Sequence, residues 1–139
     1  MDFVNYRQMV KDVNRWSKDL PRDFDLVVGV PRSGMLPASI LSLRWNVPLA
    51  SSDMFAKEGM VLDHGARLRK IKDDISKVLV VDDSILLGTT INKIQDLLKN
   101  QENFDVKFGA VYCAPGVEQH IDFFYKKYNW PRCFEWNFL

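Results

Sequence analysis

"KVLVVDDSILLGTTINKI", residues 77–94, is the stretch that decides the fold of this chain. Val78 to Val81 form an apolar, β-branched run of the kind found in a strand that is buried on both faces. Asp82 and Asp83 follow directly, and the alternation of a strand places their side chains on opposite sides. In open parallel α/β sheets, ligands bind outside the carboxyl ends of the strands. The stretch therefore predicts a ligand-binding rim at the end of a central strand.

The residues after the acidic pair predict a phosphate site. Residues 86–90 read as a short loop whose last members, Gly88, Thr89 and Thr90, open a helix. The first N–H groups of a helix have no internal partner, and that end carries about half a positive charge. A phosphate cup beside two carboxylates fits a phosphorylated sugar, with hydroxyls or a hydrated metal ion at the carboxylates. The alternative is structural, because an acidic pair and a threonine cap also occur without a ligand.

The rest of the chain alternates strands and helices around this stretch. Such alternation predicts an α/β fold with a central parallel sheet flanked by helices, joined by right-handed crossovers, in one domain of residues 1–139. The expected strands are residues 25–30, 47–51, 77–81 and 106–113, and the expected helices are residues 3–16, 35–45 and 89–100.

Composition excludes several classes of protein. The chain has 139 residues, 47% hydrophobic and 27% charged, and a net charge of +1, which gives no basic surface for nucleic acid or a membrane. No apolar run approaches the roughly 20 residues that span a bilayer, and the N-terminus is no signal peptide. Cys113 and Cys133 stand apart, as reduced thiols do, and His64 and His120 are too isolated for a metal cluster. We expect a cytoplasmic domain.

Residues 55–70 have no clear periodicity, and the segment is longer than a usual connection. It contains two glycines and four basic residues, which predicts a functional loop or lid. For any single one of these cations, a solvated surface position is the simpler interpretation. The four are Lys57, Arg67, Arg69 and Lys70.

Four apolar residues, two acids, a four-residue gap and Gly-x-Thr closely resemble the phosphoribosyl diphosphate (PRPP) signature of type I phosphoribosyltransferases. "VGVPRSG", residues 28–34, is similar to the pyrophosphate loop of that family. The resemblance covers nearly the whole chain, with the basic segment between the two motifs as in the family. It implies the type I fold with a small hood formed by the N-terminal helix, the C-terminal tail or both. It also implies a homodimer, the common assembly of these enzymes.

The resemblance implies a role for each motif. Asp82 and Asp83 would contact the ribose 2- and 3-hydroxyls, directly or through Mg²⁺, which is held mostly by PRPP or water. The basic residues of segment 55–70 would close over the pyrophosphate. The pyrophosphate would be received by Arg32, Ser33 and Gly34, with Arg32 as a catalytic cation, and the 5-phosphate by Leu86, Leu87, Gly88, Thr89 and Thr90.

Two leucines depart from the family pattern. Leu87 stands where the family usually has Ser or Thr, and the missing hydroxyl costs roughly 1.5–3 kcal/mol of phosphate binding if nothing replaces it. Leu86 stands where enzymes that use guanine, hypoxanthine or xanthine usually have an aspartate. The aromatic tail, "NWPRCFEWNFL", is faintly similar to the C-terminal segment of bacterial xanthine-guanine enzymes, but Leu86 outweighs that hint and argues against a 6-oxopurine acceptor.

A closer resemblance is to phosphoribosyltransferase modules of bacterial polysaccharide biosynthesis, often fused to a haloacid-dehalogenase-type phosphatase. It is carried by "DLVVGVPRSGMLPA", "VVDDSIL-GTT", "AVYCAPG" and "FEWN". It implies transfer of 5-phosphoribose onto a sugar hydroxyl of a glycan, with a separate phosphatase as a partner of a transferase-only chain. Asp53 and Asp83 are the candidate general bases, and Asp53 is equally well read as a turn or helix-cap residue.

Three functions follow from these resemblances. The first is a PRPP-dependent transferase that acts on a glycan hydroxyl. The second uses the same donor with a nucleobase acceptor, for nucleotide salvage. The third is a regulator that senses PRPP without turning it over, which the missing hydroxyl at Leu87 favours and the complete "PRSG" loop does not.

Overall fold

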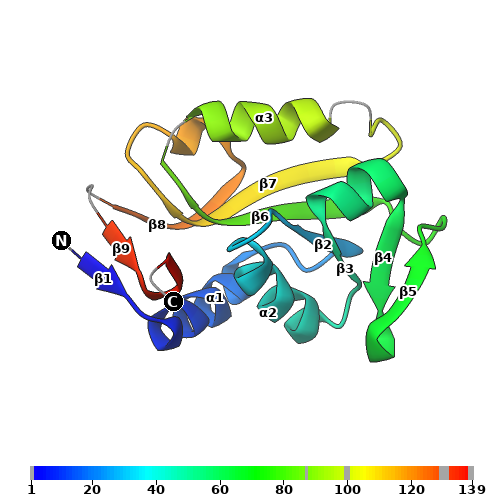
Figure 1. Cartoon of the computed structure of the whole chain (residues 1–139), viewed down its shortest axis with the longest axis horizontal. Coiled ribbons are helices and arrows are strands. Elements are labelled where there is room, and N and C mark those ends of the chain that lie inside the picture. Colours follow the sequence, from blue (N-terminus) through cyan, green and yellow to red (C-terminus); the bar gives the residue numbers. More distant parts are fainter. Residues whose placement is uncertain (1, 87, 99–100, 129–131, 138–139) are drawn as a thin grey trace.

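The computed structural model describes residues 2–86, 88–98, 101–128 and 132–137. Seven strands form the central sheet in the order β5-β4-β3-β2-β6-β7-β8 (Figure 1). The five neighbouring strands β3, β2, β6, β7 and β8 are parallel to one another. β4 pairs antiparallel with both β3 and β5. The strands are β2 (Leu26–Gly29), β3 (Leu49–Ser51), β4 (Met60–Asp63), β5 (Arg67–Lys70), β6 (Lys77–Ile85), β7 (Asp105–Cys113) and β8 (Phe123–Lys127).

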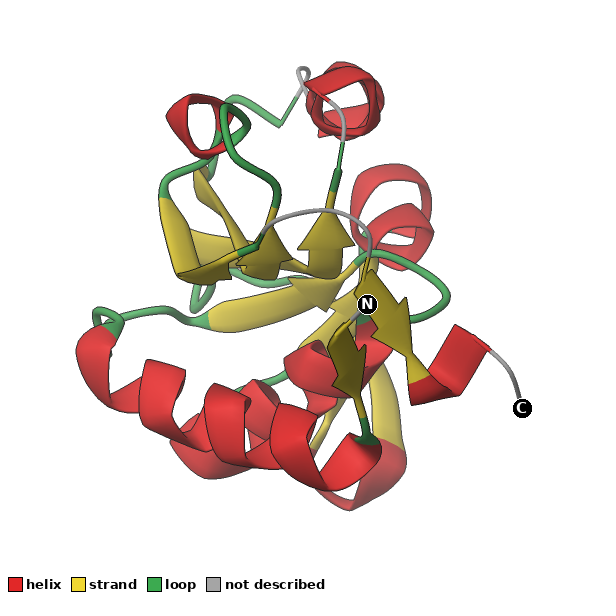
Figure 2. Cartoon of the chain, turned by 90° about the vertical axis from the view of Figure 1, so that its left-hand side faces the viewer, coloured by secondary structure: helices red, strands yellow, loops and turns green. Residues whose placement is uncertain are grey.

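Helices cover both faces of the sheet, which confirms the α/β prediction. Helices α1 (Tyr6–Asp19) and α2 (Met35–Trp45) lie on one face and α3 (Gly88–Leu98) on the other, as Figures 1 and 2 show. Asn5 caps α1 by accepting a 2.8 Å hydrogen bond from the Gln8 amide. A turn of π-helix at Met54–Glu58 packs on the α3 side through buried Phe55. Among the described residues, no helix is long and apolar enough to cross a membrane.

Strand β6 is buried on both faces. Val78 and Val80 belong to the core under α3, whereas Leu79 and Val81 belong to the core under α1 and α2. All four side chains are at most 2% exposed. This two-sided burial is the property that the continuous apolar run predicted.

The strand was expected to end at Val81, and this boundary is wrong. β6 continues to Ile85 because it stays paired with β7, where Ile85 lies opposite Cys113. On its other side β2 ends earlier, with Gly29 opposite Val81. The acidic pair therefore lies inside a strand but beyond the end of its shorter neighbour, which is what creates the rim.

Residues 55–70 contain regular structure that the sequence did not predict. β4 and β5 form an antiparallel hairpin, with Met60 opposite Lys70, and a 3-10 turn at His64–Ala66 joins them. The hairpin extends the sheet beyond β3. Its role as a lid stays a prediction.

The two ends of the described chain pair with each other. β1 (Asp2–Val4) runs parallel to β9 (Arg132–Phe134) in a separate two-stranded sheet close to α1 (Figure 1). Val4 and Phe134, opposite each other in this sheet, are each 3% exposed. The expected N-terminal helix thus begins later than predicted, with Phe3 in β1. A hood formed by the two terminal segments stays a prediction.

Candidate active site

The loop after β2 folds back against the end of β6. The Val30 amide donates to the Val81 carbonyl at 3.0 Å, and the Gly34 amide donates to the Val30 carbonyl at 2.9 Å. A Cβ on Gly34 would lie 2.3 Å from that Val30 oxygen and 2.9 Å from the Val81 oxygen, so no side chain fits. The peptide between Pro31 and Arg32 is cis. The geometry brings the "PRSG" loop to the rim that holds the acidic pair.

The two carboxylates face different sides of the sheet. Asp82 borders a small apolar cavity on the α3 side, lined in part by Val80 and Ile94. Asp83 lies on the opposite side, where its Oδ2 accepts a 2.7 Å hydrogen bond from the Trp136 indole. The Asp83 amide donates to Asp82 Oδ1 at 2.8 Å, and the two residues are only 5% and 9% exposed.

Burial makes the two acids chemically unequal. Removal from water, followed by the hydrogen bond and charge of the neighbouring Asp83 carboxylate, raises the pKa of Asp82 to about 8. Asp82 therefore keeps its proton at neutral pH and can donate a hydrogen bond to a ligand oxygen. A buried carboxyl with a strongly raised pKa at a rim is typical of a functional site.

A cavity of about 520 Å³ lies between the "PRSG" loop and the C-terminal tail. It is lined by Arg32, Ser33, Leu36, Trp136 and Asn137. Arg32 and Ser33 were predicted as ligand contacts, whereas the two tail residues were not among the predicted site residues. The aromatic composition of the tail was the only signal, and it is equally typical of a core.

The predicted 5-phosphate loop is described in part. Leu86 follows β6 and is 41% exposed. Gly88, Thr89 and Thr90 form the first turn of α3, as the motif predicted. Leu87 lies outside the described residues, and so do the side chains of residues 88–90.

Asp53, a candidate general base, lies at the start of the π-helix, beyond the end of β3. Its carboxylate is 63% exposed and 3.6 Å from Lys57 Nζ. Asp53 thus forms a solvent-exposed ion pair with Lys57, one of the predicted lid cations.

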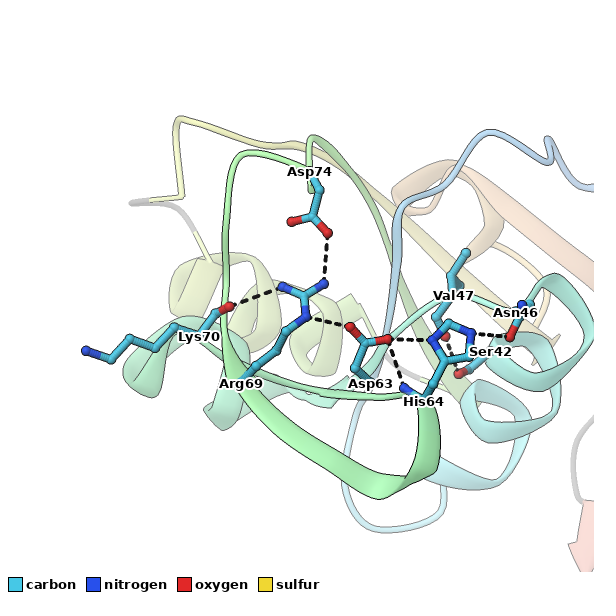
Figure 3. A network of polar contacts seen from close by, with 8 residues as sticks. All are labelled: Ser42, Asn46, Val47, Asp63, His64, Arg69, Lys70 and Asp74. Atoms are coloured by element: carbon cyan, nitrogen blue, oxygen red, sulfur yellow. Dashed lines mark hydrogen bonds and ion pairs between the residues drawn. The ribbon is translucent and has the colours of Figure 1, made fainter.

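Arg69, another predicted lid cation, is engaged in a network within the hairpin (Figure 3). Its guanidinium donates to Asp63 Oδ2 at 2.5 Å, to Asp74 Oδ2 at 2.8 Å and to the Lys70 carbonyl at 3.1 Å. The hydrogen bond from Arg69, and after it the hydrogen bonds with His64, hold the pKa of Asp63 well below its usual range. Arg67 and Lys70 are exposed.

The same network reaches the end of α2. His64 lies with Nδ1 2.8 Å from Asp63 Oδ1 and Nε2 2.6 Å from Asn46 Oδ1 (Figure 3). Asn46 ends α2 in a left-handed conformation, with φ at 55°. The hairpin is therefore attached to α2 as well as to β3.

The phosphoribosyl transferase domain model matches residues 2–138. The chain belongs to the phosphoribosyltransferase family. The expected type I fold, with its mostly parallel sheet, is confirmed.

Three known proteins illustrate what the chain is similar to. The xanthine-guanine phosphoribosyltransferase of Chromohalobacter salexigens is 26% identical over 121 residues, which cover 86% of this chain and 72% of that protein. The amidophosphoribosyltransferase of Synechocystis is 32% identical over 96 residues, and the match spans 60% of this chain but only 19% of that protein. The structure of the Helicobacter pylori xanthine-guanine-hypoxanthine phosphoribosyltransferase superposes with a TM-score of 0.76 at 19% identity, covering 99% and 93% of the two chains.

Proposed function

We propose that this chain transfers 5-phosphoribose from PRPP to an acceptor and releases pyrophosphate. The observation that carries the proposal is the meeting of three elements at one rim. The acidic pair of β6 lies beyond the end of β2, the "PRSG" loop follows β2, and the first turn of α3 follows β6, all at the same edge of the sheet. Each supplies the chemistry that one part of PRPP requires.

The two phosphate groups of the donor have separate places in this proposal. Arg32 and Ser33 line the cavity and would bind the pyrophosphate, with the guanidinium opposing the charge that develops on the leaving group. Gly34 would act through the shape of the loop, because its own amide is engaged by Val30. The first turn of α3 would bind the 5-phosphate through its unpaired N–H groups.

The ribose hydroxyls would be held by the acidic pair. Asp82, which keeps its proton, would donate to an oxygen, while Asp83 would accept from a hydroxyl. Their burial excludes water from the face where the sugar becomes cationic. For an acceptor hydroxyl, Asp83 is the better general base, because Asp53 is exposed and paired with Lys57.

The acidic pair also fits Mg²⁺. No group of three or more potential ligand side chains occurs in the described part of the chain. Two adjacent carboxylates suit this ion, which usually takes one or two of them and completes its shell with substrate phosphates and water. Asp83 would hold the ion, directly or through water, and Asp82, which keeps its proton, would donate to a water or PRPP oxygen of its shell. Neutralisation of the leaving pyrophosphate is the chemistry that bound Mg²⁺ supplies.

A sugar hydroxyl of a glycan is the acceptor we propose first. The cavity that the "PRSG" loop shares with Trp136, the partner of Asp83, is lined by the polar side chains of Arg32, Ser33 and Asn137 with one indole wall. The side chain of Leu86 offers no hydrogen bond to a 6-oxopurine. The resemblance to polysaccharide-synthesis modules supports the same acceptor, and a separate phosphatase and a homodimer belong to this proposal. The second candidate is a nucleobase, which the name of the Chromohalobacter relative supports.

An acceptor screen with isotopically labelled PRPP and Mg²⁺ tests both candidates. We expect label to pass to oligosaccharide fragments with release of pyrophosphate. Transfer to a nucleobase alone would favour the second candidate. If PRPP raises the melting temperature but no acceptor releases pyrophosphate, the chain is a sensor and the proposal fails.

Asp82→Asn and Asp83→Asn test the site itself. Asp83→Asn removes a negative charge at the reacting sugar and is expected to slow turnover by about 100-fold or more. Asp82→Asn keeps a donor in place of the protonated carboxyl, so its loss should be smaller. Asp73→Asn, on an exposed residue of the β5–β6 loop, is the matched control and should turn over normally. Normal turnover of both site variants would refute the assignment.

A further inference from the structure

A column of aromatic rings runs from the core of the molecule to Asp83. The Tyr112 and Tyr128 ring centroids lie 4.9 Å apart, and Phe134 stacks on Tyr112 at 5.5 Å and 20°. Trp136 stacks in turn on Phe134 at 4.9 Å and 21°, and Tyr6 contacts the indole at 5.7 Å. Rings from β7, the tail and α1 thus form one continuous packing unit.

The column is fixed at its base. Tyr112 is fully buried, and its hydroxyl donates to Asp12 Oδ2 on α1 at 2.6 Å. Gln8 donates to the other oxygen of the same carboxylate at 2.8 Å. The ring on which Phe134 stacks therefore has a set position.

The column is also fixed at its outer end. The Tyr6 amide, in the first turn of α1, donates to Glu135 Oε2 at 3.1 Å. β1 and β9 pair directly beside this contact, with Val4 opposite Phe134. Ring stacking on Phe134 holds the indole of Trp136 directly. The pairing of β1 with β9 and the bond from the start of α1 to Glu135 fix the backbone just before it.

The indole of Trp136 has one polar atom, Nε1, and this atom contacts the acidic pair at Asp83. Trp136 Nε1 is a donor only, and it lies 2.7 Å from Asp83 Oδ2. A carboxylate has about four lone-pair positions, so this bond leaves room for a substrate hydroxyl. Trp136 also lines the cavity with Arg32, so one side chain touches both the carboxylate and the space next to the pyrophosphate loop.

We propose that Trp136 is a positioning residue for Asp83. The proposal rests on PRPP binding at this rim. The indole holds the carboxylate in its binding orientation before the donor arrives, which removes an ordering cost from binding. Because its N–H is bound to Asp83 and one face is stacked on Phe134, the indole acts on the donor through the carboxylate.

Trp136→Phe tests the proposal because it keeps a ring in the column and removes the N–H. Trp45→Phe is the matched control, since that indole stacks on Phe24 at 6.0 Å and is not among the cavity or rim residues. The dissociation constant of Mg²⁺–PRPP is measured by calorimetry. Loss of a hydrogen bond to a carboxylate should raise it about tenfold in Trp136→Phe and leave it unchanged in Trp45→Phe.

The outcomes separate this inference from the proposed function. If the wild-type protein binds PRPP and Trp136→Phe binds it equally well, the positioning role is overturned while the function stands. If the wild-type protein does not bind PRPP, both are overturned.

An indole ¹⁵N spectrum of the wild-type protein gives a second readout. The Trp136 N–H resonance, assigned through its contacts with the Tyr6 ring, should move when Mg²⁺–PRPP is added, because its acceptor carboxylate gains a new partner. A tryptophan that only fills the core would not respond. An unmoved resonance at saturating PRPP overturns the proposal, and this measurement decides the matter even if Trp136→Phe fails to fold.

Discussion

At the residue scale, the acidic pair shows how far sequence reasoning reaches. The alternation of β6 placed Asp82 and Asp83 on opposite faces, as the structure has them. Their different environments could not be predicted, because these depend on residues remote in sequence. Asp82 is buried by apolar neighbours such as Phe108, whereas Asp83 meets Trp136 from the tail.

The pH dependence of stability should reveal the burial of Asp82. Its pKa is about 8 in the folded chain and near the ordinary value of 3.8 in the unfolded chain. Between these values the unfolded chain has lost a proton that the folded chain keeps, so the stabilisation is present at low pH and disappears as the pH rises towards 8. Asp82→Asn cannot ionise, and its unfolding free energy relative to wild type should therefore rise across this window by a few kcal/mol.

Urea unfolding of both proteins at several pH values between 4 and 8 measures this difference. Asp63 has the opposite effect on the pH dependence of stability. Its pKa is lowered in the folded chain, so the stabilisation that it gives is lost as the pH falls below 4. Asp73→Asn removes an exposed carboxylate and serves as the control, with a pH-independent difference from wild type. A flat difference for Asp82→Asn as well would show that Asp82 is ionised in the fold.

At the element scale, segments with an apolar run or a clear period were predicted, including the short strands β2 and β3, whereas the β4–β5 hairpin was not. The strand in residues 77–81 and the helix in residues 35–45 were recognised from continuous apolar runs and periodicity. β4 and β5 were missed because each has only four residues with mixed side chains, so no period is visible. The attachment of the hairpin to the sheet depends on the pairing of β4 with β3, a contact that local sequence does not encode.

Arg69→Gln tests whether this hairpin cation is structural or binds ligand. The guanidinium joins Asp63 of β4 to Asp74 beyond β5, so its loss should speed amide hydrogen exchange across residues 60–70. It should also lower the unfolding free energy by about 1–2 kcal/mol, with little effect on PRPP affinity. Arg67→Gln, on an exposed neighbour in β5, is the control for charge and should leave exchange unchanged. Weaker PRPP binding with unchanged hairpin exchange would instead place Arg69 among the ligand contacts.

At the scale of the whole molecule, the fold closes by joining its two ends. The hood was expected from the terminal segments, but the parallel pairing of β1 with β9 was not. Such pairing links the extremes of the chain and leaves no periodic signal in either segment. The pairing of β1 with β9 also places the aromatic tail against both the core and the rim. Phe134 packs on Tyr112 in the core, and Trp136 donates to Asp83 at the rim.

Phe134→Ala tests whether the terminal sheet is part of the cooperative core. The Phe134 ring is 3% exposed and stacks between Tyr112 and Trp136 in the aromatic column. Its removal therefore leaves a buried cavity and takes a stacking partner from both neighbours. The expected loss is about 3–5 kcal/mol of unfolding free energy, in one transition. Phe124→Ala removes the same group from a ring on β8 that is 38% exposed, and it should cost about 1 kcal/mol or less. Urea unfolding followed by both far-ultraviolet circular dichroism and tryptophan fluorescence measures these values. Equal losses in the two variants, or a separate fluorescence transition in the wild-type protein, would mean that the ends of the chain pack as an independent unit on a complete core.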